Sequence, residues 1–202
     1  MADNIKAAVT LFLITLVSGL LLGGVYVLTK EPIDRANNAA LYAAYEALVP
    51  GGEDYETQEE LAAQVNEELS DGRYGSVTIN SIVKPVDAEG KALGYIVDVT
   101  SHEGYGGDIE ITVGYTDQDG ALTSTGISFL SISETAGLGM NAQNPEFKDQ
   151  FIGKSTGELT VTKSGNPGDT EINAMSGATI TSTAVTNAVD AANYAVSAAA
   201  GQ

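Results

Sequence analysis

A run of small and hydroxylated residues near the end of the sequence could hold an anion. Residues 176–183 read SGATITST and lie directly ahead of a segment with helical periodicity. Hydroxyls at a helix start can cap the helix, and free amides at the positive end of the helix dipole favour a phosphate. The run contains no basic residue, so a freely exchanging phosphate would be held by amides alone. A covalent tether would remove that weakness, and an ordinary helix cap is the alternative.

Two glycine-rich segments could lie against a flat ligand. Residues 133–140 read SETAGLGM and residues 104–107 read GYGG, each at an expected strand end. Glycine lets a backbone approach a planar group closely, and Tyr105, Leu138 and Met140 supply aromatic or apolar neighbours. Taken singly, such segments are common turns. The order of these segments along the chain strengthens the prediction of a ligand site.

Histidine and cysteine, the residues of classical nucleophile–base pairs and of many metal sites, are scarce in this sequence. It contains one histidine, His102, and no cysteine. A nucleophile with its base, a histidine metal cluster, disulfides and iron–sulfur ligation therefore cannot be assembled. We expect no catalytic residue and no metal site, and we expect His102 to lie exposed in a loop.

The charge of the chain argues against nucleic acid as a partner. The formal net charge is -18, and the acidic excess lies in residues 30–202. Such a surface repels phosphate backbones. A solvated surface is the simplest interpretation, and docking of a basic partner is the alternative.

The N-terminal part of the sequence predicts a membrane anchor. Residues 7–29 form a run of 23 residues without a charged side chain. As a helix this run would reach roughly 34 Å, enough to cross a hydrocarbon core of about 30 Å. A cleaved signal peptide is the competing interpretation, but the run is long for one and no small-residue cleavage site follows it. Basic residues lie on both sides, so charge does not set the orientation.

The rest of the pattern predicts one α+β domain. We assign residues 1–6 to a tail, 7–29 to a single transmembrane helix, 30–36 to a linker and 37–202 to the domain. Apolar residues at helical spacing, with a capping-box pattern at 57–60, predict helices over 37–49, 57–69, 145–152 and 181–200. Alternating apolar residues predict strands over 77–83, 93–100, 109–115, 122–132 and 158–163. Turn residues at 87–90 and 117–120 favour a mostly antiparallel sheet flanked by helices.

The three segments together resemble a known family. The run SGATITSTAVTNAV at 176–189 is similar to the flavinylation motif of the FMN-binding domain, found in the G subunit of the Rnf complex and the C subunit of the sodium-pumping NADH:quinone reductase. GYGG at 104–107, a strand pair with a DG turn, and ETAGLG at 134–139 follow in that family's order. The resemblance covers nearly the whole chain. The length of the chain is closer to that of the Rnf subunit than to that of the reductase subunit.

The resemblance implies a set of flavin contacts. Thr179 would carry FMN covalently through a phosphoester, made from FAD and magnesium by a separate flavin transferase. The remaining predicted cofactor-binding residues are Ser176, Gly177 and Ala178 at the phosphate end, Glu134, Thr135, Leu138 and Gly139 along the flavin, and Tyr105 in the GYGG segment. Three positions depart from the family pattern: Ser133 replaces a histidine, Ala136 a proline, and Asn173 an acidic residue.

The resemblance also implies a function and a place in the cell. The chain would be a non-autonomous electron-transfer subunit of a membrane-bound, ion-translocating ferredoxin:NAD oxidoreductase complex. Its partners would be the other membrane subunits, and its domain would lie on the extracytoplasmic side of the cell membrane. One alternative is a stand-alone anchored flavoprotein of extracellular electron transfer. Another is an acidic adhesion or sensor domain without a cofactor.

Overall fold

The computed structural model describes residues 2–118 and 121–201, and the side chains of 9–26, 29, 39–117 and 121–201. The chain divides into two compact units, Met1–Tyr42 and Ala43–Gln202. The predicted turn at 117–120 includes residues 119 and 120, which lie outside the described residues.

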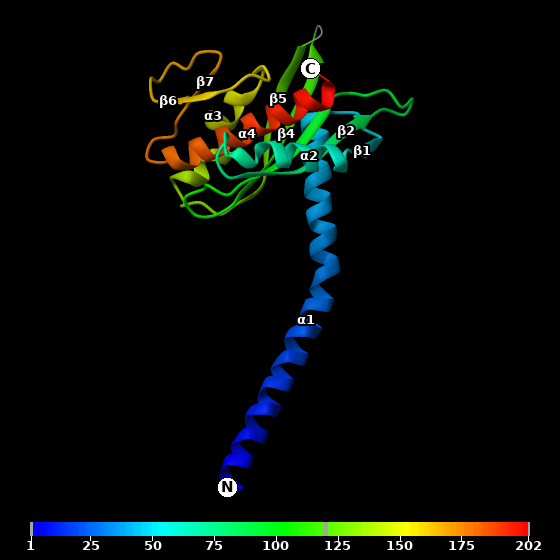
Figure 1. The fold of residues 1–202 in the computed structure, drawn as a ribbon, viewed down its shortest axis with the longest axis vertical. Coiled ribbons are helices and arrows are strands. Elements are labelled where there is room, and N and C mark those ends of the chain that lie inside the picture. Colours follow the sequence, from blue (N-terminus) through cyan, green and yellow to red (C-terminus); the bar gives the residue numbers. More distant parts are fainter. Residues whose placement is uncertain (1, 119–120, 202) are drawn as a thin grey trace. The chain divides into compact units, whose positions relative to one another are not determined.

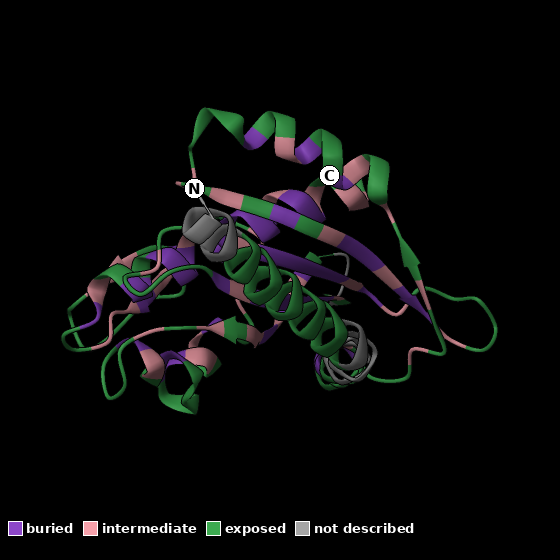
Figure 2. Ribbon diagram, turned by 90° about the horizontal axis from the view of Figure 1, so that it is seen from below, coloured by how far each residue is buried: buried purple, intermediate pink, exposed green. Residues whose placement is uncertain are grey.

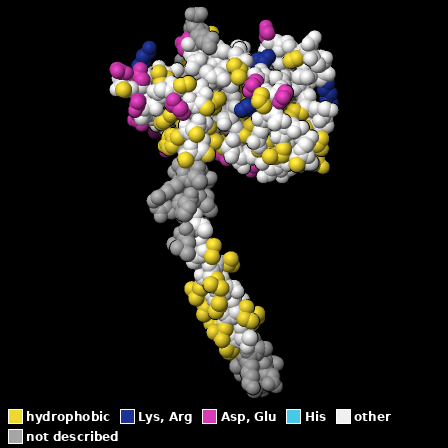
Figure 3. Space-filling model, turned by 180° about the vertical axis from the view of Figure 1, so that it is seen from behind, with side chains coloured by type: hydrophobic (Ala, Val, Ile, Leu, Met, Phe, Trp, Pro, Cys, Tyr) yellow, Lys and Arg dark blue, Asp and Glu magenta, His cyan; other side chains and the backbone are white. Residues whose placement is uncertain are grey.

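Helix α1, Ala2–Leu48, forms the first unit and extends into the second. Its segment Val9–Tyr26 is long and apolar enough to cross a membrane, and the side chains of this segment are all exposed (Figure 3). The helix continues without interruption through residues 30–36. The predicted linker is therefore helical, and the predicted helix at 37–49 is the end of α1. Lys30, Glu31, Arg35 and Ala36 are good helix formers, and Pro32 alone does not end the helix.

The second unit is built on a five-stranded antiparallel sheet with the order β1-β2-β3-β4-β5 (Figure 1). The strands are β1 (Asp54–Thr57), β2 (Val77–Val86), β3 (Tyr95–Ser101), β4 (Ile109–Gln118) and β5 (Ala121–Ile132). The four predicted strands of the meander are confirmed. The sequence did not predict β1, because four largely exposed residues with two acidic side chains carry no alternation of apolar residues.

Two long helices of this unit pack on the sheet. Helix α2, Glu59–Glu68, continues into the short 3-10 helix η1, Leu69–Asp71, and lies against β2. Helix α4, Thr179–Ala200, lies against β2, β3 and β4. The predicted capping box at 57–60 is wrong, because Thr57 still pairs with Val83 and the Gln58 amide donates to Ile82 O. The chain stays extended to that point, and Gln58 becomes the N-cap without a side-chain hydrogen bond among the described residues.

The core lies between α4 and the sheet (Figure 2). The alternating apolar residues of β4 are all fully buried: Ile109, Ile111, Val113 and Tyr115. The predicted apolar stripe of α4 is buried as well: Val185, Ala188, Val189, Ala192 and Val196. Burial of these side chains stabilises the domain by the usual 1.5–3 kcal/mol, roughly, per large apolar group.

Polar groups fasten the end of α1 to the opposite face of the sheet. The buried Asp98 carboxylate accepts hydrogen bonds from the hydroxyls of Ser81 and Thr112, both at 2.6 Å, and from the Tyr45 hydroxyl. A buried carboxylate requires such donors. Leu48 packs beside Gly114, where an added Cβ would lie 2.6 Å from the Leu48 Cβ. The sheet is therefore covered on both faces.

Short elements surround the start of α4. They are η2 (Gly139–Gln143), α3 (Pro145–Lys148), η3 (Asp149–Phe151), β6 (Thr160–Thr162) and β7 (Glu171–Asn173). The predicted helix at 145–152 divides into α3 and η3, and the predicted strand at 158–163 shortens to β6. Strand β7 pairs with β6 in parallel. The Gln150 side chain secures β7 by accepting from Asn173 N at 2.7 Å and donating to Asn173 O at 3.3 Å.

Candidate functional site

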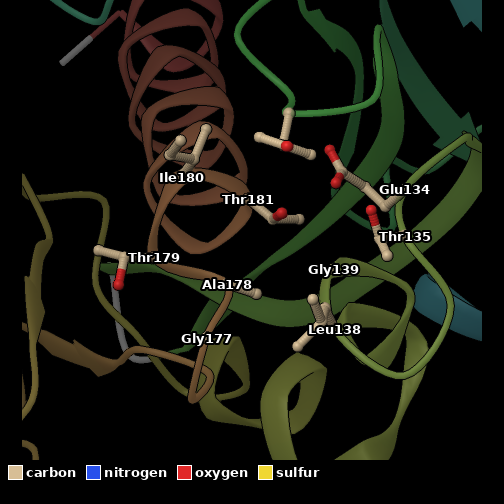
Figure 4. A pocket seen from close by; sticks show the side chains of 10 residues that line it. Glu134, Thr135, Leu138, Gly139, Gly177, Ala178, Thr179, Ile180 and Thr181 are labelled. Carbon is tan, nitrogen blue, oxygen red and sulfur yellow. The ribbon is translucent and has the colours of Figure 1, made fainter.

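A cavity of about 510 Å³ opens beside the start of α4 (Figure 4). Its lining comes from three separated segments: the loop after β3, the chain from the end of β5 to the start of η2, and the start of α4. The lining residues are Tyr105, Glu134, Thr135, Leu138, Gly139, Gly177, Ala178, Thr179, Ile180 and Thr181. The structure thus brings together eight of the nine predicted site residues. The sequence interpretation did not include Ile180 and Thr181.

Ser176 is the predicted site residue that does not line this cavity. It is exposed and lines neighbouring hollows. One of these, of about 360 Å³, also contains Gly177, Thr179, Asn173 and Lys163. A cationic side chain therefore lies in the same hollow as Thr179, although the surrounding sequence run contains no basic residue.

A tight turn leads into α4. The Ala178 amide donates to Met175 O at 3.1 Å, and Gly177 between them has a φ of 75°. This left-handed conformation favours glycine. The Ser182 hydroxyl accepts from Met175 N at 3.0 Å and donates to Ala178 O at 2.9 Å, which ties the turn to the helix.

The start of α4 has no side-chain cap among the described residues. Ala178 occupies the N-cap position, and no acidic residue lies in the first turn. The alternative of an ordinary hydroxyl cap is therefore wrong, because the N-cap residue is Ala178, which has no hydroxyl. The first-turn amides, without a side-chain cap, and the positive end of the dipole of a 22-residue helix make this a favourable place for a phosphate.

The hydroxyls of the SGATITST run differ in accessibility. Thr179, the first residue of α4, is partly exposed, whereas Thr181 is 1% exposed and Ser182 is fully buried. Thr183 is exposed and lines a separate hollow. Figure 4 shows the Thr179 side chain directed away from Thr181 and Glu134. Thr179 therefore offers an accessible hydroxyl on the outer side of the helix start.

The GYGG loop packs its backbone against the chain after β5. A Cβ on Gly106 would lie 2.1 Å from Ser133 O, so a larger residue would force the loop away. The Gly106 amide donates to Glu134 Oε1 at 3.2 Å. These glycines therefore serve close packing that positions Glu134, and they leave Tyr105 71% exposed at the cavity mouth.

The lining has two chemical parts. Tyr105, Leu138 and Ile180 are exposed apolar or aromatic side chains at the rim, 71%, 42% and 55% exposed respectively. Glu134 and Thr181 bring a carboxylate and a hydroxyl to the inner wall. This lining fits a flat, largely apolar ring with one polar edge, and the helix start fits its phosphate.

His102 lies outside this cavity. As expected it is exposed, just after β3, with Nδ1 3.0 Å from Asp108 Oδ1 and Nε2 3.0 Å from Thr78 Oγ1. Its contacts are those of a surface side chain.

Comparison with known proteins identifies the class first. Residues 104–193 match the FMN-binding domain, the part of the chain that contains the cavity-lining residues. The fold and the site therefore define a protein with an FMN-binding domain.

Relatives over the full length identify the family. The chain is 31% identical over 196 residues to the G subunit of the Na⁺-translocating ferredoxin:NAD⁺ oxidoreductase complex of Acetobacterium woodii, covering 92% of this chain and 87% of that one. It is also 31% identical to the G subunit of the ion-translocating oxidoreductase complex of Methanosarcina acetivorans, covering 97% and 96%. The chain belongs to this family of G subunits. Together with the apolar segment of α1, the family indicates a membrane-anchored protein.

A solved structure supports the fold. The C subunit of the Na⁺-translocating NADH-quinone reductase of Parabacteroides distasonis superposes with a TM-score of 0.50 and 20% sequence identity, covering 73% of this chain and 76% of that one. The α+β architecture predicted from the sequence is thus shared with a known fold.

Proposed function

We propose that this chain is an electron-transfer subunit of a membrane-bound, ion-translocating ferredoxin:NAD oxidoreductase complex, and that it carries FMN in a phosphoester bond to Thr179. The observation that carries the proposal is the cavity, which joins the three FMN-domain segments at a helix start whose first residue presents an accessible hydroxyl. When bound, FMN supplies the electron-carrying chemistry that the side chains of this sequence lack.

Thr179 is the proposed attachment residue because its surroundings suit a phosphate. The first-turn amides and the helix dipole favour an anion there, and Lys163 lines a hollow that Thr179 also lines. In the transferase reaction, the Thr179 oxygen would form a bond to the phosphorus of the FMN part of FAD. AMP would leave, and the hydroxyl proton would pass to the transferase or to solvent. This chain needs no base of its own for that reaction.

Asn173 departs from the family pattern, which often has an acidic residue at this position, and the departure bears on recognition by the transferase. Its side-chain oxygen accepts from the Gly165 amide at 3.3 Å, and its backbone is secured by Gln150. The residue thus shapes the loop beside Thr179 without adding a charge. We propose that this neutral residue still presents Thr179 to the transferase.

The membrane arrangement completes the proposal. Helix α1 would anchor the protein, the domain would lie on the extracytoplasmic side, and other membrane subunits would exchange electrons with the flavin. A stand-alone anchored flavoprotein would use the same site. Purification from native membranes distinguishes the two, because a member of a complex co-purifies with several membrane proteins.

Co-expression with a flavin transferase tests the attachment. A denaturing gel viewed under ultraviolet light should show a fluorescent band for the wild-type chain. Thr179→Ala should abolish this band, and the matched Thr183→Ala variant should retain it. A wild-type chain without fluorescence would refute the proposal and favour an acidic adhesion or sensor domain; fluorescence in Thr179→Ala would place the bond elsewhere.

A further inference from the structure

We propose that Thr181 is a positioning residue for the flavin, whose hydroxyl donates to the polar edge of the ring while the Glu134 carboxylate accepts from it. The inference rests on the proposed function, since it requires FMN in this cavity. In this role Thr181 does not attach the flavin. Together with Glu134 it would orient the ring with its polar edge toward the inner wall of the cavity.

The Thr181 hydroxyl is the first observation. Thr181 is 1% exposed and lines the cavity, and Figure 4 shows it on the same side as Glu134 and Thr135. The buried hydroxyls of Ser182 and Thr186 each donate to the carbonyl four residues earlier, both at 2.9 Å. Among the residues that the structure describes, the Thr181 hydroxyl has no such partner. The Thr181 oxygen is not among the buried unsatisfied side-chain atoms of these residues, so it is open to the cavity and available to a ligand there.

Gly139 is the second observation. A Cβ at this position would lie 2.5 Å from Glu134 Oε2 and 2.6 Å from Thr181 Oγ1. Glycine therefore keeps the space between these two groups free. The other carboxylate oxygen, Glu134 Oε1, is held by the Gly106 amide. One carboxylate oxygen and one hydroxyl thus converge on the same part of the cavity wall from two different elements.

The chemistry of the pair matches one edge of a flavin. The pyrimidine edge of the isoalloxazine alternates carbonyl acceptors with an imide N–H donor. A carboxylate accepts from the imide and a hydroxyl donates to a carbonyl, while the apolar side of the ring meets the rim of Tyr105, Leu138 and Ile180. Reduction places negative charge on the polar edge. A hydroxyl donor therefore favours reduction, whereas an adjacent carboxylate opposes it.

The test uses the full chain, co-expressed with the transferase and purified in detergent. The reduction equilibrium of the bound flavin is measured against a reference dye, together with the visible absorption spectrum. Thr181→Val should keep the fluorescent band and lower the reduction equilibrium constant about tenfold or more. Thr181→Ser should restore the wild-type value, and the exposed control Thr183→Val should not change it. A Thr181→Val value within about twofold of wild type, or an equal shift in Thr183→Val, overturns the inference.

Two further variants test the inference if the Thr181→Val protein cannot be obtained in folded form. Gly139→Ala should retain the band but shift both the spectrum and the reduction equilibrium, because its Cβ displaces both polar groups. Glu134→Gln should make the flavin easier to reduce, the opposite direction to Thr181→Val. An unchanged Gly139→Ala protein, or a Glu134→Gln protein that is harder to reduce, contradicts the assigned roles.

Failure of this inference is distinguishable from failure of the proposed function. A wild-type chain without covalent flavin refutes both. A fluorescent wild-type chain whose flavin is insensitive to Thr181→Val refutes only the role of Thr181.

Discussion

The two ends of helix α4 bury polar side chains in different ways. In the second half of the helix, Asp190 accepts from Leu159 N at 2.9 Å. Asn193 accepts from the Tyr115 hydroxyl at 2.8 Å and donates to Gly157 O at 2.9 Å. In the first turn, Thr181 is equally buried, and its hydroxyl has no partner among the described residues.

The difference teaches that burial alone does not separate structural from functional polar groups. Asp190, Asn193 and Thr181 are 5%, 2% and 1% exposed. What differs is whether the protein itself supplies the hydrogen-bond partner. The second half of α4 uses its polar groups to hold the fold, and the first turn keeps its polar group available to a ligand. Substitutions at the two ends should therefore have different consequences.

Removing the best-partnered group should cause the largest loss of stability. Asn193→Ala leaves the fully buried Tyr115 hydroxyl and Gly157 O unpaired, so we expect a loss of about 3 kcal/mol. Chemical unfolding of the detergent-solubilised chain, followed by circular dichroism, measures this loss. Flavin attachment should persist under folding conditions. A loss under about 0.5 kcal/mol would show that the second half of α4 does not depend on these bonds.

Asp190 should make stability depend on pH. Burial, with a smaller contribution from Glu158, raises the pKa of Asp190 from an ordinary 3.8 to about 7, although the Leu159 amide opposes the shift. Between these values the unfolded carboxyl ionises while the folded one retains its proton, so the group opposes folding increasingly up to about pH 7. Asp190→Asn does not titrate, so its stability relative to wild type should rise by roughly 4 kcal/mol between about pH 4 and about pH 8. Chemical unfolding of both proteins at the two pH values measures this rise. The same stability difference between Asp190→Asn and wild type at both pH values would contradict the prediction.

A substitution in the turn before α4 should have an intermediate effect on stability and a larger effect on flavin attachment. Gly177→Ala forces an alanine into a left-handed conformation and against Leu138, whose Cδ2 would lie 3.0 Å from the new Cβ. We expect a loss of about 1–2 kcal/mol and weaker flavin fluorescence on denaturing gels. Gly90→Ala, at another left-handed glycine with open space around its Cβ and outside both the cavity and the hollow beside Thr179, is the control for backbone strain alone. Equal fluorescence in the two variants would argue against a special role of the turn.

The smallest effect on stability should come from Thr181→Val. Because the hydroxyl forms no hydrogen bond within the described chain, its replacement by a methyl group should change stability by less than about 0.5 kcal/mol. Thermal unfolding of the flavin-free chain measures this. A loss comparable with that of Asn193→Ala would remove the distinction between the two ends of α4.

Much of the fold follows from patterns that are local in the sequence. The alternation at 109–115 predicted β4, and the stripe from Val185 to Val196 predicted the buried face of α4. The short strands β1 and β7 were not predictable, because four and three residues carry too little periodicity. The start of α4 was placed two residues too late, since a run of small hydroxylated residues has several equivalent cap positions.

The parts of the site that consist of continuous sequence motifs could be predicted. The contacts between residues that are distant in the sequence could not. The motifs identified eight residues that line the cavity. The proximity of Lys163 to Thr179 depends on the parallel pairing of Thr162 with Asn173, which no local pattern indicates. The importance of Thr181 emerges from the lack of a partner within the described structure, and the space beside Gly139 depends on side chains from two distant elements.

The different directions of Thr179 and Thr181 have a consequence for protein engineering. The two side chains point in different directions from the helix start, although both residues line the cavity. A designer could therefore tune the electron affinity of the cofactor at Thr181 while leaving the surface that the modifying enzyme must recognise untouched. The same two-residue separation would let natural variation adjust these two properties independently.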